Sequence, residues 1–155
     1  MECENEIRRE LQMLLSGLSC DFCALALKEK DSGALKWTVV VGNLNERCLN
    51  MADPPNRGLS GTVAKVGRPM TLQVSELVRS RDLYNYPIMI SEKLRSAYAV
   101  PLMKNAKAFA ILLAGDRKRR VYRPDERSAA IASGERLLNL LSGIPGQMGQ
   151  ANGCL

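Results

Sequence analysis

The stretch SAYAVPLMKNAKAFAILLAGD, residues 96–116, contains the two clearest strand patterns in the chain. Residues 96–103 and 108–115 are apolar runs of strand length, and the polar residues 104–107 lie between them. Short apolar runs bounded by polar turn residues are typical of buried strands. We therefore predict a β-hairpin over this stretch.

A second hairpin is predicted upstream, in the stretch FCALALKEKDSGALKWTVVV. Residues 22–28 and 35–41 have the strand pattern, and the Asp-Ser-Gly sequence between them is typical of a turn. Counting alternate residues back from Val39 and Val41 places Trp37 on the same face of the sheet as these two valines.

Amphipathic helices are predicted near both ends of the chain. Residues 4–16 have helical spacing of apolar residues, and we expect Gly17 to end this helix. Residues 125–141 form the second helix, with Pro124 near its first turn, and residues 143–155 are predicted to be a flexible tail. The apolar faces consist of Ile7, Leu11, Leu14 and Leu15 in the first helix and of Ile131, Leu137, Leu138 and Leu141 in the second.

The stretch RGLSGTVAKVGRPM, residues 57–70, predicts a short helix that begins at residues 58–60. Gly67 suits the position after the last helical residue, and Pro69 follows it. The apolar face of this helix consists of Leu59, Val63 and Val66.

The segment after this helix connects it to the hairpin at residues 96–116. We predict a short strand at 70–74, a helical or irregular segment as far as Tyr84, a break at 86–87 and one helical turn at 92–95. The order of elements predicts one α+β domain over residues 1–142. Its central antiparallel sheet has the N- and C-terminal helices on one face and the ligand-pocket loops on the other.

Composition limits the function. The chain has 155 residues, a net charge of +6 and no histidine, so it lacks the usual general base and the imidazole metal ligand. The only dense basic run is Arg-Lys-Arg-Arg at residues 117–120. We interpret it as a solvated turn, with a docking patch for an acidic protein as the alternative. No aromatic residue interleaves with the basic ones, so no nucleic-acid partner is expected.

No apolar run reaches the roughly 20 residues that span a bilayer, so no membrane partner is expected. The first residues of the chain include Glu2, Glu4 and Glu6 and do not resemble a signal peptide. We therefore expect a cytoplasmic protein.

The cysteines raise the question of a metal or redox site. An odd count without an export signal favours reduced thiols. Cys20 and Cys23 form a CxxC motif, and Cys48 could complete a three-thiolate site such as an Fe–S cluster, but small buried or surface thiols are the favoured interpretation. The five cysteines are Cys3, Cys20, Cys23, Cys48 and Cys154.

The glycines at residues 58–61 admit different interpretations. The stretch lacks the Gly-Lys-Ser/Thr ending of a Walker loop, and its glycine spacing is not that of a dinucleotide fingerprint. A helix start with little side-chain bulk offers free N–H groups and about half a positive charge, which suits a small anion. The alternative is that Gly58 and Gly61 only allow the helix and the sheet to pack closely.

Four segments of the chain, together with the order of its elements, resemble a GAF domain. They are DFCALALKEKDSGALKWTVVVG, GLSGTVAKVGRPMTL, SAYAVPLMKNAKAFAILLAGD and YRPDERSAAIASGERLLNLL. The resemblance covers residues 6–141, and the spaced glycines followed by the Val-Pro-Leu strand are its most specific part. It implies a ligand-sensing or interaction module, although fold membership does not name the ligand.

Within that family, the chain resembles the freestanding Nre-type nitrate receptors. This resemblance implies nitrate or a similar small anion as the ligand, a sensor histidine kinase as the partner, no cofactor and no enzymatic activity. The terminal helices are also where GAF domains commonly pair, so a homodimer is an alternative use of that surface. Where this chain has Ser60, alanine is expected in the receptors. The implied ligand-binding residues are Trp37, Leu59, Ser60, Tyr86 and Ile88.

Other functions of GAF domains stay open at this point. Free methionine sulfoxide reductases need a reactive thiolate beside the ligand, and we expect cysteines in them at position 60 and on the crossover segment. This chain has serine at position 60 and no cysteine at residues 84–96. Asn105 and residues 122–126 faintly resemble the cyclic-nucleotide-binding members. A bilin chromophore is disfavoured, because no suitably placed cysteine or histidine is present.

Overall fold

The computed structural model describes residues 2–142, and the predicted tail at residues 143–155 lies outside them. The strands of this part form one antiparallel six-stranded sheet in the order β3-β2-β1-β6-β5-β4. The two predicted hairpins are β1–β2 and β5–β6, and they meet where β1 pairs with β6. The strands are β1 (Phe22–Lys28), β2 (Leu35–Val41), β3 (Ala52–Asp53), β4 (Met70–Gln73), β5 (Ser96–Lys104) and β6 (Lys107–Asp116).

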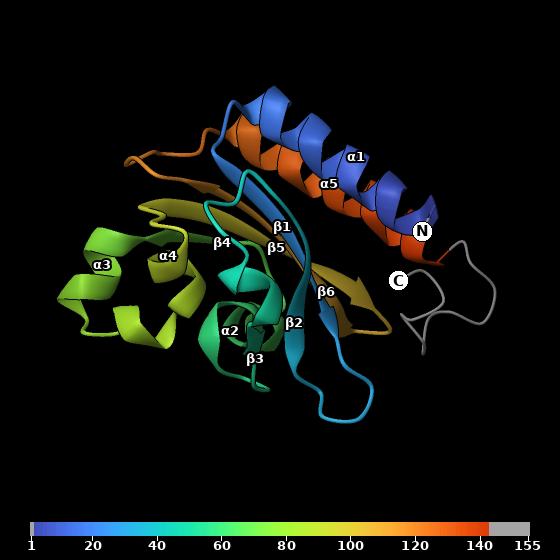
Figure 1. The fold of residues 1–155 in the computed structure, drawn as a ribbon, viewed down its shortest axis with the longest axis horizontal. Coiled ribbons are helices and arrows are strands. Elements are labelled where there is room, and N and C mark those ends of the chain that lie inside the picture. Colours follow the sequence, from blue (N-terminus) through green and yellow to red (C-terminus); the bar gives the residue numbers. More distant parts are fainter. Residues whose placement is uncertain (1, 143–155) are drawn as a thin grey trace.

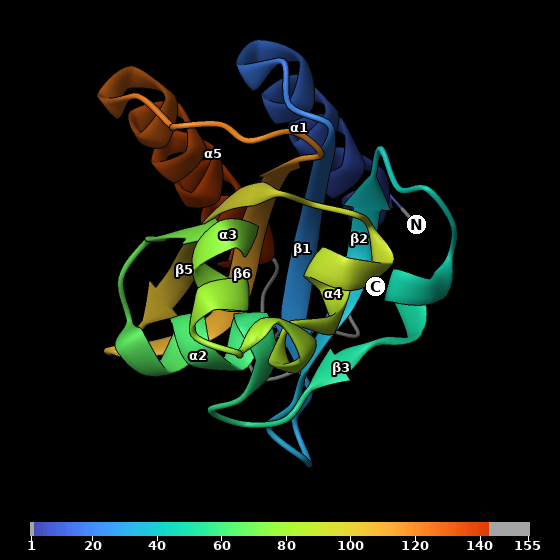
Figure 2. The same ribbon diagram turned by 90° about the vertical axis from the view of Figure 1, so that its left-hand side faces the viewer.

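The helices form layers on the two faces of the sheet. The long helices α1 and α5 lie side by side on one face (Figure 1), and α2, α3 and α4 lie on the other (Figure 2). This arrangement confirms the predicted α+β fold. None of the helices within residues 2–142 has the length and apolar character needed to cross a membrane. The helices are α1 (Glu2–Leu18), α2 (Gly58–Val66), α3 (Val74–Arg79), α4 (Pro87–Ser91) and α5 (Pro124–Ser142), with the short 3₁₀ helices η1 (Arg47–Asn50) and η2 (Leu83–Asn85).

Each face of the sheet has its own hydrophobic core. The first core lies between the sheet and the pair α1 and α5, and includes Leu11, Leu25 and Leu137. The second core lies on the opposite face, beneath α2, α4 and η1, and includes Phe22, Leu59 and Ile88. Since both faces are covered, the central strands β1 and β6 are almost entirely buried, which explains their nearly continuous apolar sequences.

A β-bulge in β2 corrects the predicted orientation of Trp37. Along β1, Leu25 pairs with Val39 and the next residue, Ala26, pairs with Trp37, so Thr38 is an extra residue in β2. The extra residue interrupts the alternation of side chains. Val39 therefore lies in the first core with Val41, whereas Trp37 lies in the second core. The prediction that Trp37 shares a face with these valines is wrong.

Helix ends and faces also differ in part from the prediction. Gly17 lies inside α1, which ends at Leu18, and Ser19 then adopts a left-handed conformation with φ of 53°. On α5, Ile131 is 36% exposed, because small side chains such as Ser133 form the buried face instead. On α2, Val66 is 49% exposed, although the helix ends at left-handed Gly67 as predicted.

The crossover segment contains a helix that was not predicted. Pro87 begins α4 and does not merely break the chain, since the fixed φ of proline suits the first turn of a helix. The helical turn predicted at residues 92–95 is wrong. Glu92 already follows the last residue of α4, and Lys93 has a left-handed φ of 55°.

Arg117 connects three parts of the chain that are distant in sequence. Its guanidinium donates to Glu92 Oε1 at 2.8 Å, to the Glu92 carbonyl at 2.9 Å and to the Gly42 carbonyl at 2.9 Å. Its backbone N–H donates to the Asp21 carboxylate at 2.8 Å. Glu92 is fully buried and also accepts a bond from the Leu44 N–H at 2.8 Å. One cation thus holds the start of β1, the end of β2 and the end of α4 together.

The basic run at residues 117–120 is therefore not simply a solvated turn. Arg120 is half-buried like Arg117, and its guanidinium bonds to the carboxylates of Asp116 and Glu126. Only the two residues between the arginines are exposed. The run serves mainly to neutralise buried acids of the fold.

Replacing Arg117 by methionine is expected to destabilise the protein strongly. The Arg117→Met change leaves the Glu92 carboxylate buried without its cation, which should lower the free energy of unfolding by about 3 kcal/mol. The exposed neighbour Lys118 provides the control, because Lys118→Met should change the free energy of unfolding by less than about 0.5 kcal/mol. Urea denaturation monitored by circular dichroism measures both. Adding Glu92→Gln to Arg117→Met should recover part of the lost stability. Equal losses of unfolding free energy in Arg117→Met and Lys118→Met would contradict this role of Arg117.

Candidate functional site

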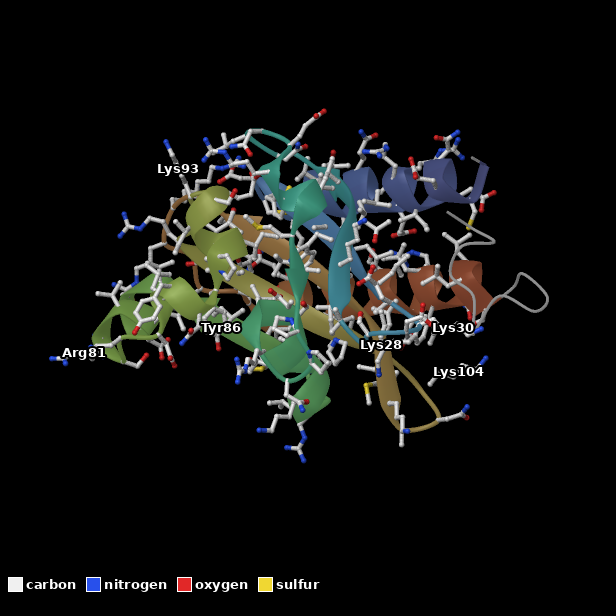
Figure 3. The ribbon with its side chains drawn as sticks, turned by 60° about the horizontal axis from the view of Figure 1, so that its bottom comes forward. Lys28, Lys30, Arg81, Tyr86, Lys93 and Lys104 are labelled. Atoms are coloured by element: carbon white, nitrogen blue, oxygen red, sulfur yellow. The ribbon has the colours of Figure 1, made fainter. Side chains whose placement is uncertain are left out.

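The residues predicted to bind a ligand all lie on the face of the sheet that α2 and α4 cover. Trp37, Leu59 and Ile88 are buried in the second core, and Ser60 is buried at the start of α2. Tyr86 is half-buried against the same core and belongs to the crossover segment, where Figure 3 labels it. Helix α2 contacts both α4 and β3. The structure therefore brings the five residues to one region, while their role as ligand contacts remains a prediction.

The indole N–H of Trp37 is the most informative polar group of this region. Trp37 is 1% exposed, and its Nε1 has no hydrogen-bond partner among the described residues. A buried donor without an acceptor costs about 1–3 kcal/mol, so such groups are rare unless they have a purpose. The β-bulge at Thr38 turns this donor toward the second core. An acceptor group of a ligand would satisfy it.

Helix α2 begins where a strand and a loop press closely against it. Arg57, which precedes the helix, is extended and provides no side-chain cap. Gly58 has a left-handed φ of 70°, and a Cβ atom there would lie 2.4 Å from the Asp53 carboxylate. A Cβ atom on Gly61 would lie 2.6 Å from the Pro54 carbonyl oxygen. The glycines thus permit close packing, as the alternative interpretation proposed, but the packing is against residues 53–56.

The carboxylate of Asp53 supplies the cap that Arg57 does not. Asp53 Oδ2 accepts bonds from the Ser60 N–H at 2.9 Å and from the Ser60 hydroxyl at 2.5 Å. Asp53 is 3% exposed, and its burial raises the pKa of the carboxyl, an effect that the two bonds from Ser60 oppose. One backbone amide that the sequence analysis assigned to a ligand is therefore already bonded within the chain.

Sequence reasoning did not find Asp53, although one signal was present. An acidic residue followed by two prolines, shortly before a glycine-rich helix start, is well placed to return to that helix as a cap. The Leu59 N–H belongs to the first turn of α2, whose donors have no intrahelical acceptor. The region therefore offers N–H groups and apolar side chains to a ligand, together with one carboxylate.

The cysteines do not form the metal site that the sequence left open. Cys20 and Cys23 lie in the first core with their sulfur atoms 3.6 Å apart, whereas Cys48 lies in the second core, on the other side of the sheet. Within residues 2–142, no group of three or more histidine, cysteine or acidic side chains is arranged to hold a metal ion. The prediction that Cys20, Cys23 and Cys48 could form a three-thiolate site is therefore wrong.

Comparison with known proteins shows the family to which this fold belongs. A family model of the GAF domain matches residues 3–140. The chain belongs to the GAF family. A search of functionally curated proteins found no match to the sequence.

Two solved GAF structures from Staphylococcus aureus are similar to the chain. A NreA protein mutated in its nitrate-binding site is 30% identical with a TM-score of 0.72, and the match covers 83% of this chain and 95% of that one. A hypothetical protein is 34% identical with a TM-score of 0.68, covering 74% and 95%. The free methionine-R-sulfoxide reductase of Neisseria meningitidis is 16% identical with a TM-score of 0.73, covering 90% and 78%, and this likeness shows the fold alone.

The thiol of Cys48 is expected to be a poor nucleophile, in contrast to the thiolate that a reductase needs. Burial, followed by the charge of Glu92, raises its pKa to about 11. At pH 8 only about one molecule in a thousand would carry the thiolate, and reactivity should increase as the pH rises toward that value. Hydrogen bonding from Cys23 lowers the pKa of Cys20. Iodoacetamide should therefore modify Cys20 before Cys48 in the folded protein, as peptide mass spectrometry would show. The reverse order would contradict the expected difference in reactivity between the two thiols.

Proposed function

We propose that this GAF domain is a small-anion receptor, with nitrate as its ligand, that regulates a sensor histidine kinase. The observation that carries the proposal is the Trp37 indole N–H, which is buried without an acceptor among the described residues, in the same core as Leu59 of α2. Nitrate accepts hydrogen bonds through each of its oxygen atoms and carries the negative charge that a helix start favours.

The surroundings of Trp37 suit an anion that is only weakly hydrated. Leu59 and Ile88 provide apolar surface, and the Leu59 N–H provides a second donor from the first turn of α2. Tyr86 precedes α4 and packs against the same core, so it would cover the bound ligand. The proposal assigns no catalytic step to these residues.

The similar proteins support nitrate over other ligands of the family. The S. aureus NreA protein has a nitrate-binding site, and it is 30% identical to this chain over 83% of the chain. Binding is expected to be micromolar or weaker, because it depends on a small number of N–H donors, and each hydrogen bond to a charged group contributes only about 1.5–3 kcal/mol.

Replacing Trp37 by phenylalanine should weaken nitrate binding about tenfold or more. The Trp37→Phe change removes the N–H and keeps an aromatic ring, and a hydrogen bond to a charged group contributes about 1.5–3 kcal/mol. Isothermal titration calorimetry with nitrate, chloride and cyclic AMP measures the effect and the class of ligand.

Tyr98→Phe is the matched control, because Tyr98 is buried in the first core on the opposite face and also loses one polar group. It should bind nitrate as the unchanged protein does. A folded Trp37→Phe protein with unchanged nitrate affinity would remove the main support for the proposal. If the unchanged protein binds cyclic AMP and does not bind nitrate, the ligand belongs to another class.

The output of the domain requires a surface that responds to the ligand. A partner is regulated only if it binds one ligand state better than the other. Helices α1 and α5 lie together on the face opposite the candidate site and form one layer over the sheet (Figure 1). We propose this layer as the surface for the kinase or, alternatively, for a second copy of the chain.

The kinase should be inhibited by the anion-free protein and released by nitrate. Autophosphorylation of the sensor histidine kinase, measured with this protein present and with nitrate added or omitted, tests the proposal. Trp37→Phe should remain inhibitory at nitrate concentrations that release the unchanged protein, because it binds nitrate more weakly. Phosphorylation that does not respond to either the protein or nitrate would contradict the regulatory role even if nitrate binds.

A further inference from the structure

The start of α2 already holds an anion, which is the carboxylate of Asp53. Oδ2 of this residue bonds to both the N–H and the hydroxyl of Ser60, and Oδ1 lies against Gly58, where only a missing side chain leaves room for it. The pairing of β3 with β2 fixes this position, since Asp53 is opposite Leu35. The carboxylate is therefore part of the folded site and not a mobile surface group.

Asp53 lies on β3, which pairs with the strand that carries the proposed donor, and Leu35 opposite Asp53 belongs to the second core as Trp37 does. Trp37 follows Leu35 by two residues along β2, and its backbone N–H donates to the Met51 carbonyl, two residues before Asp53. Both side chains are buried, at 1% and 3% exposure, so solvent screens their surroundings little. An external anion that uses the Trp37 N–H would therefore be close to the Asp53 carboxylate.

We propose that Asp53 is an internal anion that competes with external anions for the start of α2, and so sets the affinity and selectivity of this site. The inference rests on the proposed anion-binding function. While it is ionised, Asp53 occupies the Ser60 N–H and repels a second negative charge. When it is neutral, Asp53 can release this amide and can donate its own O–H to the ligand.

The charged groups around Asp53 do not neutralise it. The elements packed against β3 are β2 and α2, which contribute Lys36 and Lys65, and Arg57 lies just before α2. All three are exposed, and Asp53 forms no salt bridge with a described residue. The bonds from Ser60 and the helix start are its main stabilisation as an anion.

This competition predicts that nitrate binding takes up a proton. Burial raises the pKa of Asp53, and nitrate remains an anion throughout the range in which the carboxyl titrates. As the pH falls through the Asp53 pKa, the neutral form becomes populated and the competing charge disappears. Nitrate affinity should therefore increase as the pH falls and reach a constant value below that pKa.

Asp53→Asn tests the proposal, because asparagine has the same shape and can still accept the bonds from Ser60 without carrying a charge. Asp31→Asn is the control, since it makes the same charge change at an exposed position in the β1–β2 turn. Calorimetric titration with nitrate, formate and chloride between pH 5 and pH 8 measures affinity, and circular dichroism checks the fold. At pH 8, Asp53→Asn should bind nitrate at least about tenfold more tightly than the unchanged protein and show no pH dependence, whereas Asp31→Asn should behave as the unchanged protein does.

The outcomes separate this inference from the proposed function. If Asp53→Asn binds nitrate no more tightly than the unchanged protein, the inference is wrong and the receptor function stands. If Asp53→Asn gains binding of formate or chloride but not of nitrate, the inference stands and nitrate is the wrong ligand. If neither the unchanged protein nor Asp53→Asn binds any of the three anions, the inference and the proposed function are both wrong. A pH series on the unchanged protein, extended from pH 8 to the lowest pH at which circular dichroism shows it folded, tests the same point without a substitution. A nitrate affinity that is constant over this whole range would overturn the inference.

Discussion

The arrangement of the candidate site depends on the Arg117 guanidinium, which donates to the Glu92 carboxylate and to the backbone carbonyls of Asp21, Gly42 and Glu92. It binds the end of β2 through Gly42 and the end of α4 through Glu92. Trp37 lies on β2, and Ile88 lies on α4. The relative position of the sheet and the crossover segment therefore depends on a cation that lies outside the candidate site. Because Glu92 is fully buried, its carboxylate has no low-energy alternative to this cation.

The strands and long helices could be predicted because their signals are local. The bounds of β1 and β2 agree with the prediction, since each is an apolar run between turn residues. The bulge at Thr38 could not be predicted in this way, because an extra residue becomes visible only in the pairing with β1. The same applies to α4, where Pro87 is compatible with both a break and a helix start, and packing against the second core decides between them.

The candidate site was predicted only in part, and for a related reason. Trp37 and the start of α2 came from the family resemblance together with the chemistry of helix ends. Asp53 was missed because its role requires β3, a strand of two residues whose pairing with β2 no sequence pattern indicates. Ser60 was predicted as a ligand contact, whereas its N–H and its hydroxyl both bond to that carboxylate. Side chains that act on a neighbouring element become identifiable only when the tertiary structure is known.

The bulge in β2 has a spectroscopic consequence. The chain contains one tryptophan, and the bulge places it in the second core, 1% exposed and with its N–H unbonded among the described residues. All intrinsic indole fluorescence therefore originates in the second core. An indole in such apolar surroundings emits at short wavelength, and contact of a polar molecule with the N–H shifts and often quenches that emission. If the proposed site binds a ligand, Trp37 would therefore report its occupancy optically, without a label and without a background from other tryptophans.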